Sequence, residues 1–168
     1  MYKRQLYGCD LEDARNRAGF ACVYHPAVTG RALSDFSFLK IGPEDYLPLE
    51  TPLSARAMSF APATMTIDPG DYRFEKLFPE FEGDDGLAEA YFESREAPAI
   101  RLGGYPTFTQ SDPRGYVDPA RYGDFTLATF DTTDGIMWGD SGVAQFFMHE
   151  ADLKRRDFSR VAYNWDCC

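Results

Sequence analysis

Metal-ligating side chains are scarce in this sequence. Its 168 residues include only two histidines and four cysteines, and no two cysteines show the C-x-x-C spacing of a zinc site. Cys167 and Cys168 are adjacent, which is a poor geometry for two ligands of one tetrahedral ion. The pair Gly103-Gly104 lacks the Lys-Ser/Thr ending of a phosphate-binding loop and the spacing of a dinucleotide fingerprint. We therefore expect no metal site and no cofactor.

Long apolar runs are also missing. No stretch approaches the length of about 18 apolar residues that a membrane-spanning helix needs. The basic start of the chain is not followed by the apolar core of a signal peptide. Without an export signal, the cysteines are expected to be reduced thiols. The sequence thus predicts a cytoplasmic protein that makes no contact with a membrane.

Positive charge is the third deficiency. The 17 Lys and Arg residues are outnumbered by 27 Asp and Glu residues, which gives a formal net charge of −10. A chain this acidic repels phosphate backbones, so nucleic acid is not an expected partner. The segment from Glu44 to Glu96 holds 13 acidic and 4 basic residues, a local balance of −9. Such a segment is typical either of a solvated face or of an acidic surface that meets a basic partner.

The sequence does contain the turn-forming residues that separate the strands of a β-rich fold. Its 14 glycines and 11 prolines separate short runs rich in Phe, Tyr, Val and Thr, and its length suits one domain. Thr126, Ala128 and Phe130 are expected to share one face of a strand. Helices are predicted over 71–78, 87–95 and 151–156, and strands over 19–25, 54–67, 125–130, 142–148 and 160–165. The sum is an α+β fold, mainly an antiparallel β-sheet with two or three short helices.

The first five residues are interpreted as foreign to the domain. Their sequence, MYKRQ, matches the translation of a transposon-type sequencing adapter, ATG-TAT-AAG-AGA-CAG. The alternative is a genuine start codon. With an adapter, the chain is a metagenomic fragment whose native part begins near Leu6, and such scars are left out of fold reasoning. The expected domain then covers residues 6–168 and is truncated at its N-terminus.

Three segments resemble one known family. They are residues 101–114 (RLGGYPTFTQSDPR), 135–147 (GIMWGDSGVAQFF) and 152–168, which ends in YNWDCC. They are similar to the YwqG-like family, a bacterial domain of unknown function. The resemblance implies an α+β fold of antiparallel strands and supplies no accepted activity. Members are longer at the N-terminus, which agrees with a truncated domain, and many carry a Leu-Leu-Gln-Ile-Asp strand whose glutamine is absent from residues 127–131 here.

The tetrapeptide GDSG at 139–142 resembles the nucleophile loop of trypsin-like proteases. A nucleophilic serine at Ser141 needs a histidine within hydrogen-bond reach and a third group to orient it. Only His25 and His149 exist. The favoured interpretation is a tight turn, in which Asp140 and Ser141 bond the nearby backbone and the glycines adopt positive φ.

A second candidate for a functional site is the stretch of glycine and aromatic residues around Gly103 and Gly104. Gly103 and Gly104 permit the close approach of either another strand or a ligand, so the nearby aromatic residues line a pocket or pack at a bulged crossing. Arg114 is expected to pair with Asp112, with Asp140 or with a ligand carboxylate, by default in a surface salt bridge. The candidate ligand-binding residues are Gly103, Gly104, Tyr105, Gln110, Arg114, Trp138, Asp140 and Ser141.

The sequence therefore favours a non-enzymatic binding or interaction module, whose partner is a protein or a small molecule. One version is an immunity-type protein that masks a toxin. The alternative is an enzyme or small-ligand sensor with a pocket around Trp138 and Asp140, in which Asp140 is the acid and Arg114 holds an anion. A concave site that encloses Arg114, Trp138 and Asp140 together would favour the alternative.

Overall fold

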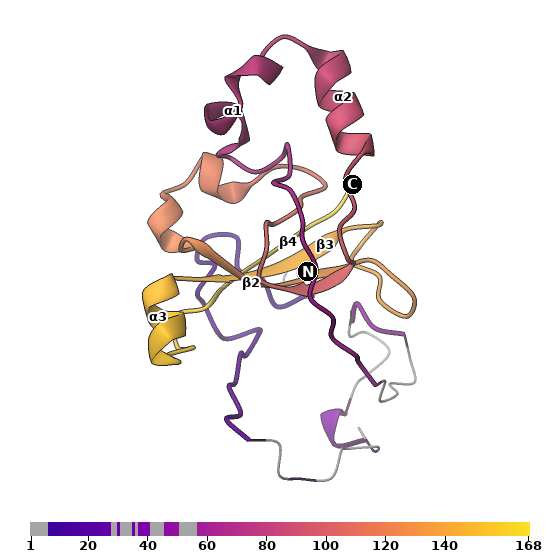
Figure 1. The fold of residues 1–168 in the computed structure, drawn as a ribbon. Coiled ribbons are helices and arrows are strands. Elements are labelled where there is room, and N and C mark those ends of the chain that lie inside the picture. The colour runs from indigo at the N-terminus through magenta and orange to yellow at the C-terminus, as the bar shows by residue number, and fades with distance from the viewer. Residues whose placement is uncertain (1–6, 28–29, 31–34, 36, 41–45, 51–56) are drawn as a thin grey trace.

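The computed structural model describes residues 7–27, 30, 35, 37–40, 46–50 and 57–168. The adapter predicted at residues 1–5 and the start of the strand predicted at 54–67 lie outside these residues. Within them, the fold is built on a four-stranded antiparallel sheet (Figure 1). Its strands, in spatial order, are β1 (Ile100–Leu102), β2 (Phe125–Asp131), β3 (Val143–Met148) and β4 (Ala162–Asp166). The predicted α+β class is confirmed, and β2, β3 and β4 lie where the sequence predicts strands.

The helices follow from local signals in the sequence. The side chain of Asp84 accepts a hydrogen bond from the backbone N of Leu87 (2.9 Å) and so caps the longest helix, while Arg156 ends another at a φ of 57°. None of the helices in the described part of the chain is long and apolar enough to cross a membrane. The helices are α1 (Phe74–Leu77), α2 (Asp85–Glu93) and α3 (Glu150–Arg155), with 3₁₀ turns η2 (Ser37–Leu39), η3 (Pro79–Phe81), η4 (Pro113–Gly115) and η5 (Pro119–Arg121).

Two of the predicted strands are wrong. Neither residues 19–25 nor the described part of 54–67 contains a strand. Phe20 instead packs on the face of the sheet, with its ring centroid 6.0 Å from that of Phe146 and 5.2 Å from that of Tyr163. The aromatic content that suggested a strand thus serves to cover a sheet from above rather than to extend it at an edge.

One irregularity in β2 decides which residues face which side. Thr126 pairs with Phe147 of β3, but Ala128 pairs with Phe146, so a β-bulge at Leu127 shifts the register. Phe146 and Phe147 are neighbours in β3 and point to opposite faces, so their partners Ala128 and Thr126 also point to opposite faces. The expectation that they share a face is wrong, because the extra residue reverses the alternation.

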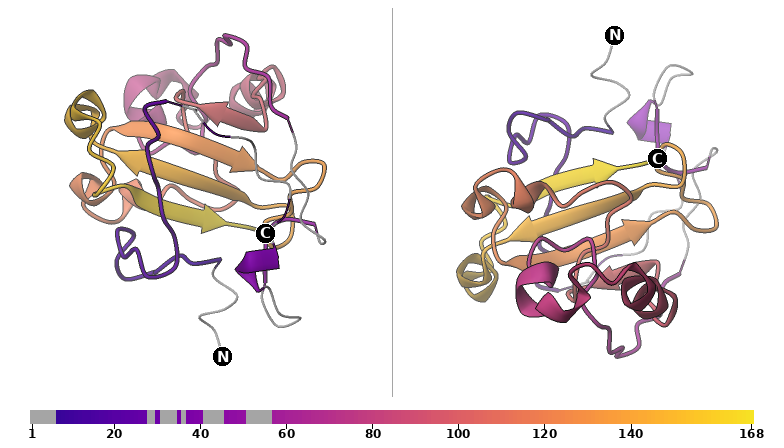
Figure 2. Two further views of the ribbon diagram at one scale, coloured as in Figure 1. Left: turned by 90° about the horizontal axis from the view of Figure 1, so that it is seen from below. Right: turned by 90° about the horizontal axis from the view of Figure 1, so that it is seen from above.

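The two faces of the sheet differ in chemistry. The aromatic face is crossed by the N-terminal segment, and the other, the polar face, is covered by the segment 105–123 (Figure 2). The helices α1 and α2 lie on the polar side but project away from the sheet (Figure 1). Cross-strand pairing places side chains of adjacent strands side by side on each face. The aromatic face includes Ala128, Phe130, Ala144, Phe146, Tyr163 and Trp165. The polar face includes Arg101, Thr129, Asp131, Gln145, Asn164 and Asp166.

Candidate functional site

The residues predicted to bind a ligand do not come together in one place. The guanidinium of Arg114 lies over the ring of Phe147, on the polar side of the sheet, with its carbon 5.0 Å from the ring centroid. Trp138 belongs to the cluster of Ala144 and Tyr163 on the aromatic face. The sheet therefore separates Arg114 from Trp138. Their role in binding stays a prediction, but the pair cannot share one pocket.

Arg114 makes a buried ion pair rather than the expected surface salt bridge. Its side chain is only 1% exposed, and its Nη2 lies 2.7 Å from Asp112 Oδ2 and 3.1 Å from Asp71 Oδ2. The guanidinium also lies over the ring of Tyr72, 4.9 Å from the centroid. Of the partners considered from the sequence, Asp112 is the one found. Asp71 is added by a segment 43 residues away, which sequence spacing does not reveal.

The GDSG tetrapeptide forms a turn before β3. Ser141 is exposed and adopts a φ of 56°, as the turn requires. His149 follows the last residue of β3, so the length of that strand lies between it and Ser141. The His149 ring contacts the backbone O of Ala120 and the side chain of Arg15, both at 3.1 Å. This histidine is not placed to activate the serine.

The remaining predicted residues shape the loop that leaves β1. Gly103 and Gly104 adopt φ values of 72° and 79°, and a Cβ at Gly104 would meet the sulfur of Met65. The carbonyl of Tyr105 accepts a hydrogen bond from Arg101 Nη2 (3.2 Å). Gln110 donates from Nε2 to the carbonyl of Cys167 (2.6 Å). Each of these contacts positions the chain over the sheet.

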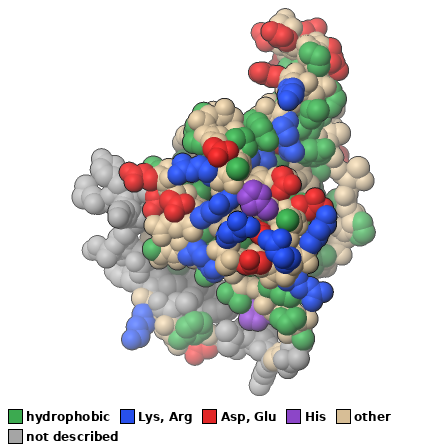
Figure 3. All heavy atoms as spheres, turned by 90° about the vertical axis from the view of Figure 1, so that its left-hand side faces the viewer, with side chains coloured by type: hydrophobic (Ala, Val, Ile, Leu, Met, Phe, Trp, Pro, Cys, Tyr) green, Lys and Arg blue, Asp and Glu red, His purple; other side chains and the backbone are tan. Residues whose placement is uncertain are grey.

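The acidic segment of the sequence forms a projection that we call the arm, residues 74–93. It comprises α1, η3 and α2, and it stands away from the sheet (Figure 1). Lys76 is its one basic residue, against seven acidic residues that are all exposed. Acidic and apolar side chains share its tip in the space-filling view, whereas Lys and Arg gather on the body of the molecule (Figure 3). The seven are Glu75, Glu80, Glu82, Asp84, Asp85, Glu89 and Glu93.

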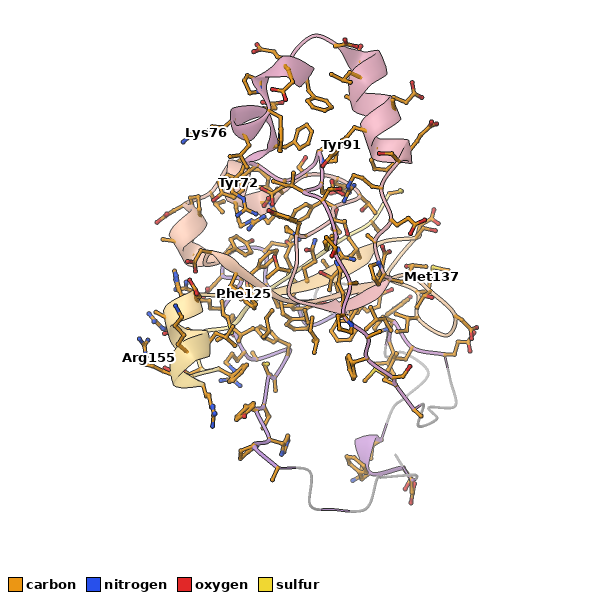
Figure 4. All side chains as sticks on the ribbon, viewed as in Figure 1. Tyr72, Lys76, Tyr91, Phe125, Met137 and Arg155 are labelled. Carbon is orange, nitrogen blue, oxygen red and sulfur yellow. The ribbon has the colours of Figure 1, made fainter. Side chains whose placement is uncertain are left out.

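The arm has a small aromatic interior of its own. The buried ring of Phe74 lies 5.1 Å from that of Phe81 and 5.4 Å from that of Tyr91, between centroids. Tyr91 points between the two helices, and Lys76 points outward (Figure 4). The hydroxyl of Tyr91 donates to the carbonyl of Ile67 (2.9 Å), which ties α2 to the base of the arm. These ring contacts fix how the two short helices sit against each other.

Buried ion pairs hold the base of the arm. Arg95, just after α2, lies 2.6 Å from Asp68, and both side chains are 7% exposed. Asp71, just before α1, is bonded by Arg73 and by Arg114. Burial alone raises the pKa of Asp71, but the hydrogen bonds from Arg73 and the charge of Arg114 outweigh it, so that the pKa is lowered. Both ends of the arm are thus held in place by charge.

A cleft of about 400 Å³ opens at the foot of the arm, and we call it the polar cleft. Its floor is the cross-strand pair Asp131 and Val143. The end of α2 and the chain that follows it form one wall, and residues 107–109 form the other. The lining therefore mixes carboxylates, threonine hydroxyls and aromatic rings. Such a mixture is common in sites for small molecules.

The polar face holds the wall 107–109 in position. Arg101 Nη2 donates to Thr107 Oγ1 (2.9 Å), and Gln145 Nε2 donates to the Thr107 carbonyl. Asp166 Oδ2 accepts from the backbone N of Thr109 (2.7 Å) and from that of Gln110 (2.7 Å). These side chains come from β1, β3 and β4. The sheet thus supports the wall of the cleft from below.

Several buried atoms of the polar face have no hydrogen-bond partner among the described residues. They include Gln145 Oε1 and Thr129 Oγ1, on side chains that are fully buried, and Asp166 Oδ1. A second set consists of the Nε atoms of Arg95 and Arg101. Leaving such groups unpaired costs roughly 1–3 kcal/mol each, and of these atoms only Arg95 Nε belongs to a residue that lines the cleft.

The carboxylates of the polar face have perturbed acidity. Burial raises the pKa of Asp131, although a backbone hydrogen bond from Thr132 and the charge of Arg101 act against it. Burial likewise raises the pKa of Asp166, against hydrogen bonds from Gln110 and Thr109. Burial lowers the pKa of Arg101. Groups with shifted pKa values beside a cleft are typical of functional sites.

None of these polar-face residues was among the candidates drawn from the sequence. A signal was present, since Thr129 and Asp131 alternate in β2 as Asn164 and Asp166 do in β4. Two-residue alternation of polar side chains normally indicates a solvent-exposed face. Here long-range chain segments cover that face, which no local pattern reveals. Within the described ranges, no group of three or more His, Cys, Asp or Glu residues could hold a metal ion.

Comparison with known proteins gives one result on family. Residues 1–167 match the family model described as Domain of unknown function (DUF1963). No curated protein matches the chain.

Proposed function

We propose from its geometry that this chain, which belongs to the family described as Domain of unknown function (DUF1963), is a non-enzymatic interaction module that docks a basic protein on the arm. Membership of this family supplies no activity by itself. The YwqG-like assignment and an immunity-type role belong to the same proposal. In the immunity-type version, the basic partner is a toxin whose active surface the arm covers.

The observation that carries the proposal is the surface of the arm. Leu77 is 56% exposed and Leu87 is 42% exposed, and both stand among the seven exposed carboxylates. Scattered exposed leucines are ordinary, but here they coincide with a formal balance of −6 over 20 residues, residues 74–93, on one projection. A surface of this kind complements a partner that carries lysine or arginine around an apolar patch.

Charge and apolar area have separate parts in such binding. The carboxylates attract a basic partner over a distance of roughly 8–10 Å, the screening length at physiological salt, and mainly raise the association rate. Burial of a leucine side chain contributes about 1.5–3 kcal/mol and mainly slows dissociation. The arm offers both on adjacent residues. We therefore expect binding that weakens with salt but is not abolished by it.

The anchoring of the arm also supports docking. The Arg95–Asp68 pair and the Asp71–Arg114 pair are already formed, and Phe74 fixes the two helices against each other. A surface that is ordered before binding loses little conformational entropy when a partner arrives. The separation of Arg114 from Trp138 adds support, since the alternative sensor would have used both in one pocket.

The test is isothermal titration of the whole chain with a designed helical peptide of lysine and leucine, about 20 residues long. We expect a dissociation constant of about 1–100 μM at low salt. A peptide with serine in place of leucine should bind roughly tenfold more weakly, because it keeps the charge and loses the apolar contact. Equal binding of the two peptides would mean attraction by net charge alone and would contradict the proposal.

Matched variants locate the binding surface. The arm variant replaces Glu80, Glu82 and Glu89 by glutamine, and the control variant replaces Glu12, Asp140 and Glu150 by their amides. All six are exposed, and both variants change the net charge by +3. Only the arm variant should lose affinity, by about tenfold. Equal losses in the two variants would show that the arm is not the docking surface.

The apolar part is tested in the same way. The substitution Leu77→Ser should weaken peptide binding severalfold, and Leu11→Ser, at a residue that is 77% exposed and distant in sequence, should not. Both are surface changes, for which stability shifts stay within about 0.5 kcal/mol. A change in melting temperature is therefore not expected to confuse the comparison.

A further inference from the structure

We infer that a groove along the outer edge of β1 binds a small organic acid, in which a carboxylate is carried on an apolar body. We call it the edge groove; residues of the segment 59–65 form one side of it, and residues of the segment 98–104 form the other. No residue of the arm lines it, so the inference goes beyond partner docking. It rests on an apolar lining, a buried cation without an ion pair, and main-chain donors on the outer edge of β1.

The lining of the edge groove is mostly apolar. Phe60, Met65 and Leu102 are its large flexible or aromatic side chains, and Phe60 and Leu102 are 67% and 65% exposed. Its volume of about 690 Å³ falls in the range of small-molecule sites, roughly 300–1,000 Å³. An apolar molecule that covers exposed side chains of this kind gains free energy from the area it removes from water.

Arg101 is the only charged residue among the described residues that line the edge groove. It is 8% exposed, and its Nη1 donates to the carbonyl of Pro98 (2.9 Å), which is another lining residue. Nη2 donates to the carbonyl of Tyr105 and to the hydroxyl of Thr107, and Nε has no partner. Every hydrogen bond of this guanidinium therefore goes to a neutral oxygen.

Arg101 lacks the counter-ion that a buried cation normally has. It forms no ion pair with a carboxylate of the described residues, and Asp131 and Asp68 act on its charge only at longer range. Arg95 and Arg114, the other buried arginines of this region, are each paired with an aspartate. Because buried charges are normally paired, a ligand carboxylate in the edge groove would supply the charge that Arg101 is missing.

The outer edge of β1 adds hydrogen-bond donors. The carbonyl of Ala99 and the N–H of Gly103 form backbone hydrogen bonds to the residues of β2, at 2.7 and 3.1 Å. Residues of an antiparallel pair alternate between bonding the partner strand and facing away from it, so the N–H groups of Ile100 and Leu102 face away from β2. No backbone hydrogen bond joins them to the described residues of the segment 59–65. A carboxylate can accept from these N–H groups.

Two residues predicted from the sequence to bind a ligand, Gly103 and Gly104, also line the edge groove. A Cβ at Gly104 would lie 2.5 Å from the sulfur of Met65, so the missing side chain lets the two sides of the groove approach each other here. The glycines thus shape one end of the groove, beside the residues that follow β1.

The experiment titrates octanoate, 1-octanol and octylamine into the isotopically labelled whole chain. The three compounds share one apolar tail and differ in charge, and affinity is read from the amide shifts of residues 59–65 and 100–104. We expect octanoate to bind with a dissociation constant below about 1 mM, and the other two at least about tenfold more weakly. The net charge of −10 would by itself favour octylamine, so a preference for octanoate must come from the groove.

Two results would overturn the inference. One is the absence of shifts in these residues up to about 3 mM octanoate. The other is binding of 1-octanol or octylamine that equals or exceeds the binding of octanoate, because the groove would then not select a carboxylate.

Variants at an exposed lining residue locate the site. Leu102→Glu should weaken octanoate binding about tenfold, and Leu102→Lys should strengthen it severalfold. Leu11→Glu, at a residue that is 77% exposed and outside the groove, adds the same charge elsewhere and should change the affinity less than about twofold. Equal losses in Leu102→Glu and Leu11→Glu would reduce the effect to net charge and overturn the site.

The part of Arg101 is tested by Arg101→Met, which should bind octanoate no better than 1-octanol. A preference for octanoate that survives this substitution would show that Arg101 does not select the ligand. The Leu102 variants leave the buried bonds of Arg101 in place, so they decide the inference even where Arg101→Met does not fold. The arm variant, at Glu80, Glu82 and Glu89, should bind octanoate normally, so failure of this inference is distinguishable from failure of the docking proposal.

Discussion

Replacement of Arg114 by methionine should lower the free energy of unfolding by a large fraction. The side chain of Arg114 is 1% exposed, and it is bonded to Asp112 and to Asp71, whose side chains are 2% and 0% exposed. Methionine keeps the apolar stem over Tyr72 and Phe147 and removes the charge. Breaking a buried pair in this way costs about 3–5 kcal/mol, because a carboxylate stays buried without its counter-ion. The free energy of unfolding of a domain is only about 5–15 kcal/mol, so a large part of it should be lost.

The loss should depend on pH in a defined direction. In the native chain, Arg73 and Arg114 lower the pKa of Asp71, so Asp71 contributes stability above its unfolded pKa of about 3.9 and loses it as pH falls through the folded value. The Arg114→Met variant lacks part of that contribution. The gap between the two proteins should therefore be full at pH 7 and should narrow below about pH 4.

Urea unfolding followed by tryptophan fluorescence measures this gap. Trp138 and Trp165 both pack on the aromatic face, away from the substitution. Arg121→Met, at an exposed residue, is the matched control and should cost less than about 0.5 kcal/mol. A loss below about 1 kcal/mol for Arg114→Met at pH 7, or a loss that is still the same at about pH 2, would refute the reasoning.

Two further predictions concern single titratable groups. Burial raises the pKa of Cys9 to about 11, so mass spectrometry after alkylation at pH 8 should find Cys9 modified about a hundredfold more slowly than the exposed Cys168, and equal rates would count against the burial of Cys9. Burial also raises the pKa of Asp131, so this residue contributes stability at low pH that is lost as pH rises through the folded pKa. The variant Asp131→Asn should therefore melt above the native chain at pH 8, and the difference should shrink toward pH 4; a variant that melts lower at pH 8 would disprove this sign.

The strands were predictable where local sequence and tertiary context agree. β3 (Val143–Met148) is mostly apolar on both faces and lies in the interior of the sheet. In β4 (Ala162–Asp166), an edge strand, apolar and polar side chains alternate. α2 was predicted as well, over 87–95, but it begins two residues earlier, at Asp85, because Asp84 is the cap. In each case, the signal lies within a few residues and needs no knowledge of distant contacts.

The failures come from contacts between distant segments. Phe20 sits in a run that reads as a strand, but its ring packs on Tyr163 instead. The bulge at Leu127 moves Thr126 to the other face, and a one-residue shift of this kind reverses every inference on which side chains are buried. Arg114 pairs with Asp112, one of its three expected partners and only two residues away, yet it also bonds Asp71, which is 43 residues away. Sequence spacing carries no information on such coverage.

The candidate sites divide in the same way. The acidic character of the arm was evident from composition, because charge counts need no structure. The polar cleft was not, since its lining residues Asp68, Phe108 and Asp131 come from distant segments that meet only in the folded chain. The residues favoured from the sequence, Trp138 and Asp140, drew attention because glycine and aromatic residues are conspicuous, and the structure uses Trp138 to cover the sheet.

The central claim is that the arm docks a basic partner, and chemical-shift mapping tests it most directly. Addition of the lysine–leucine peptide to the isotopically labelled chain should shift the amides of α1 and α2, residues 74–93, and leave those of α3 and the turn at Asp140 unchanged. Shifts spread over acidic residues throughout the molecule, or centred away from the arm, would contradict the account.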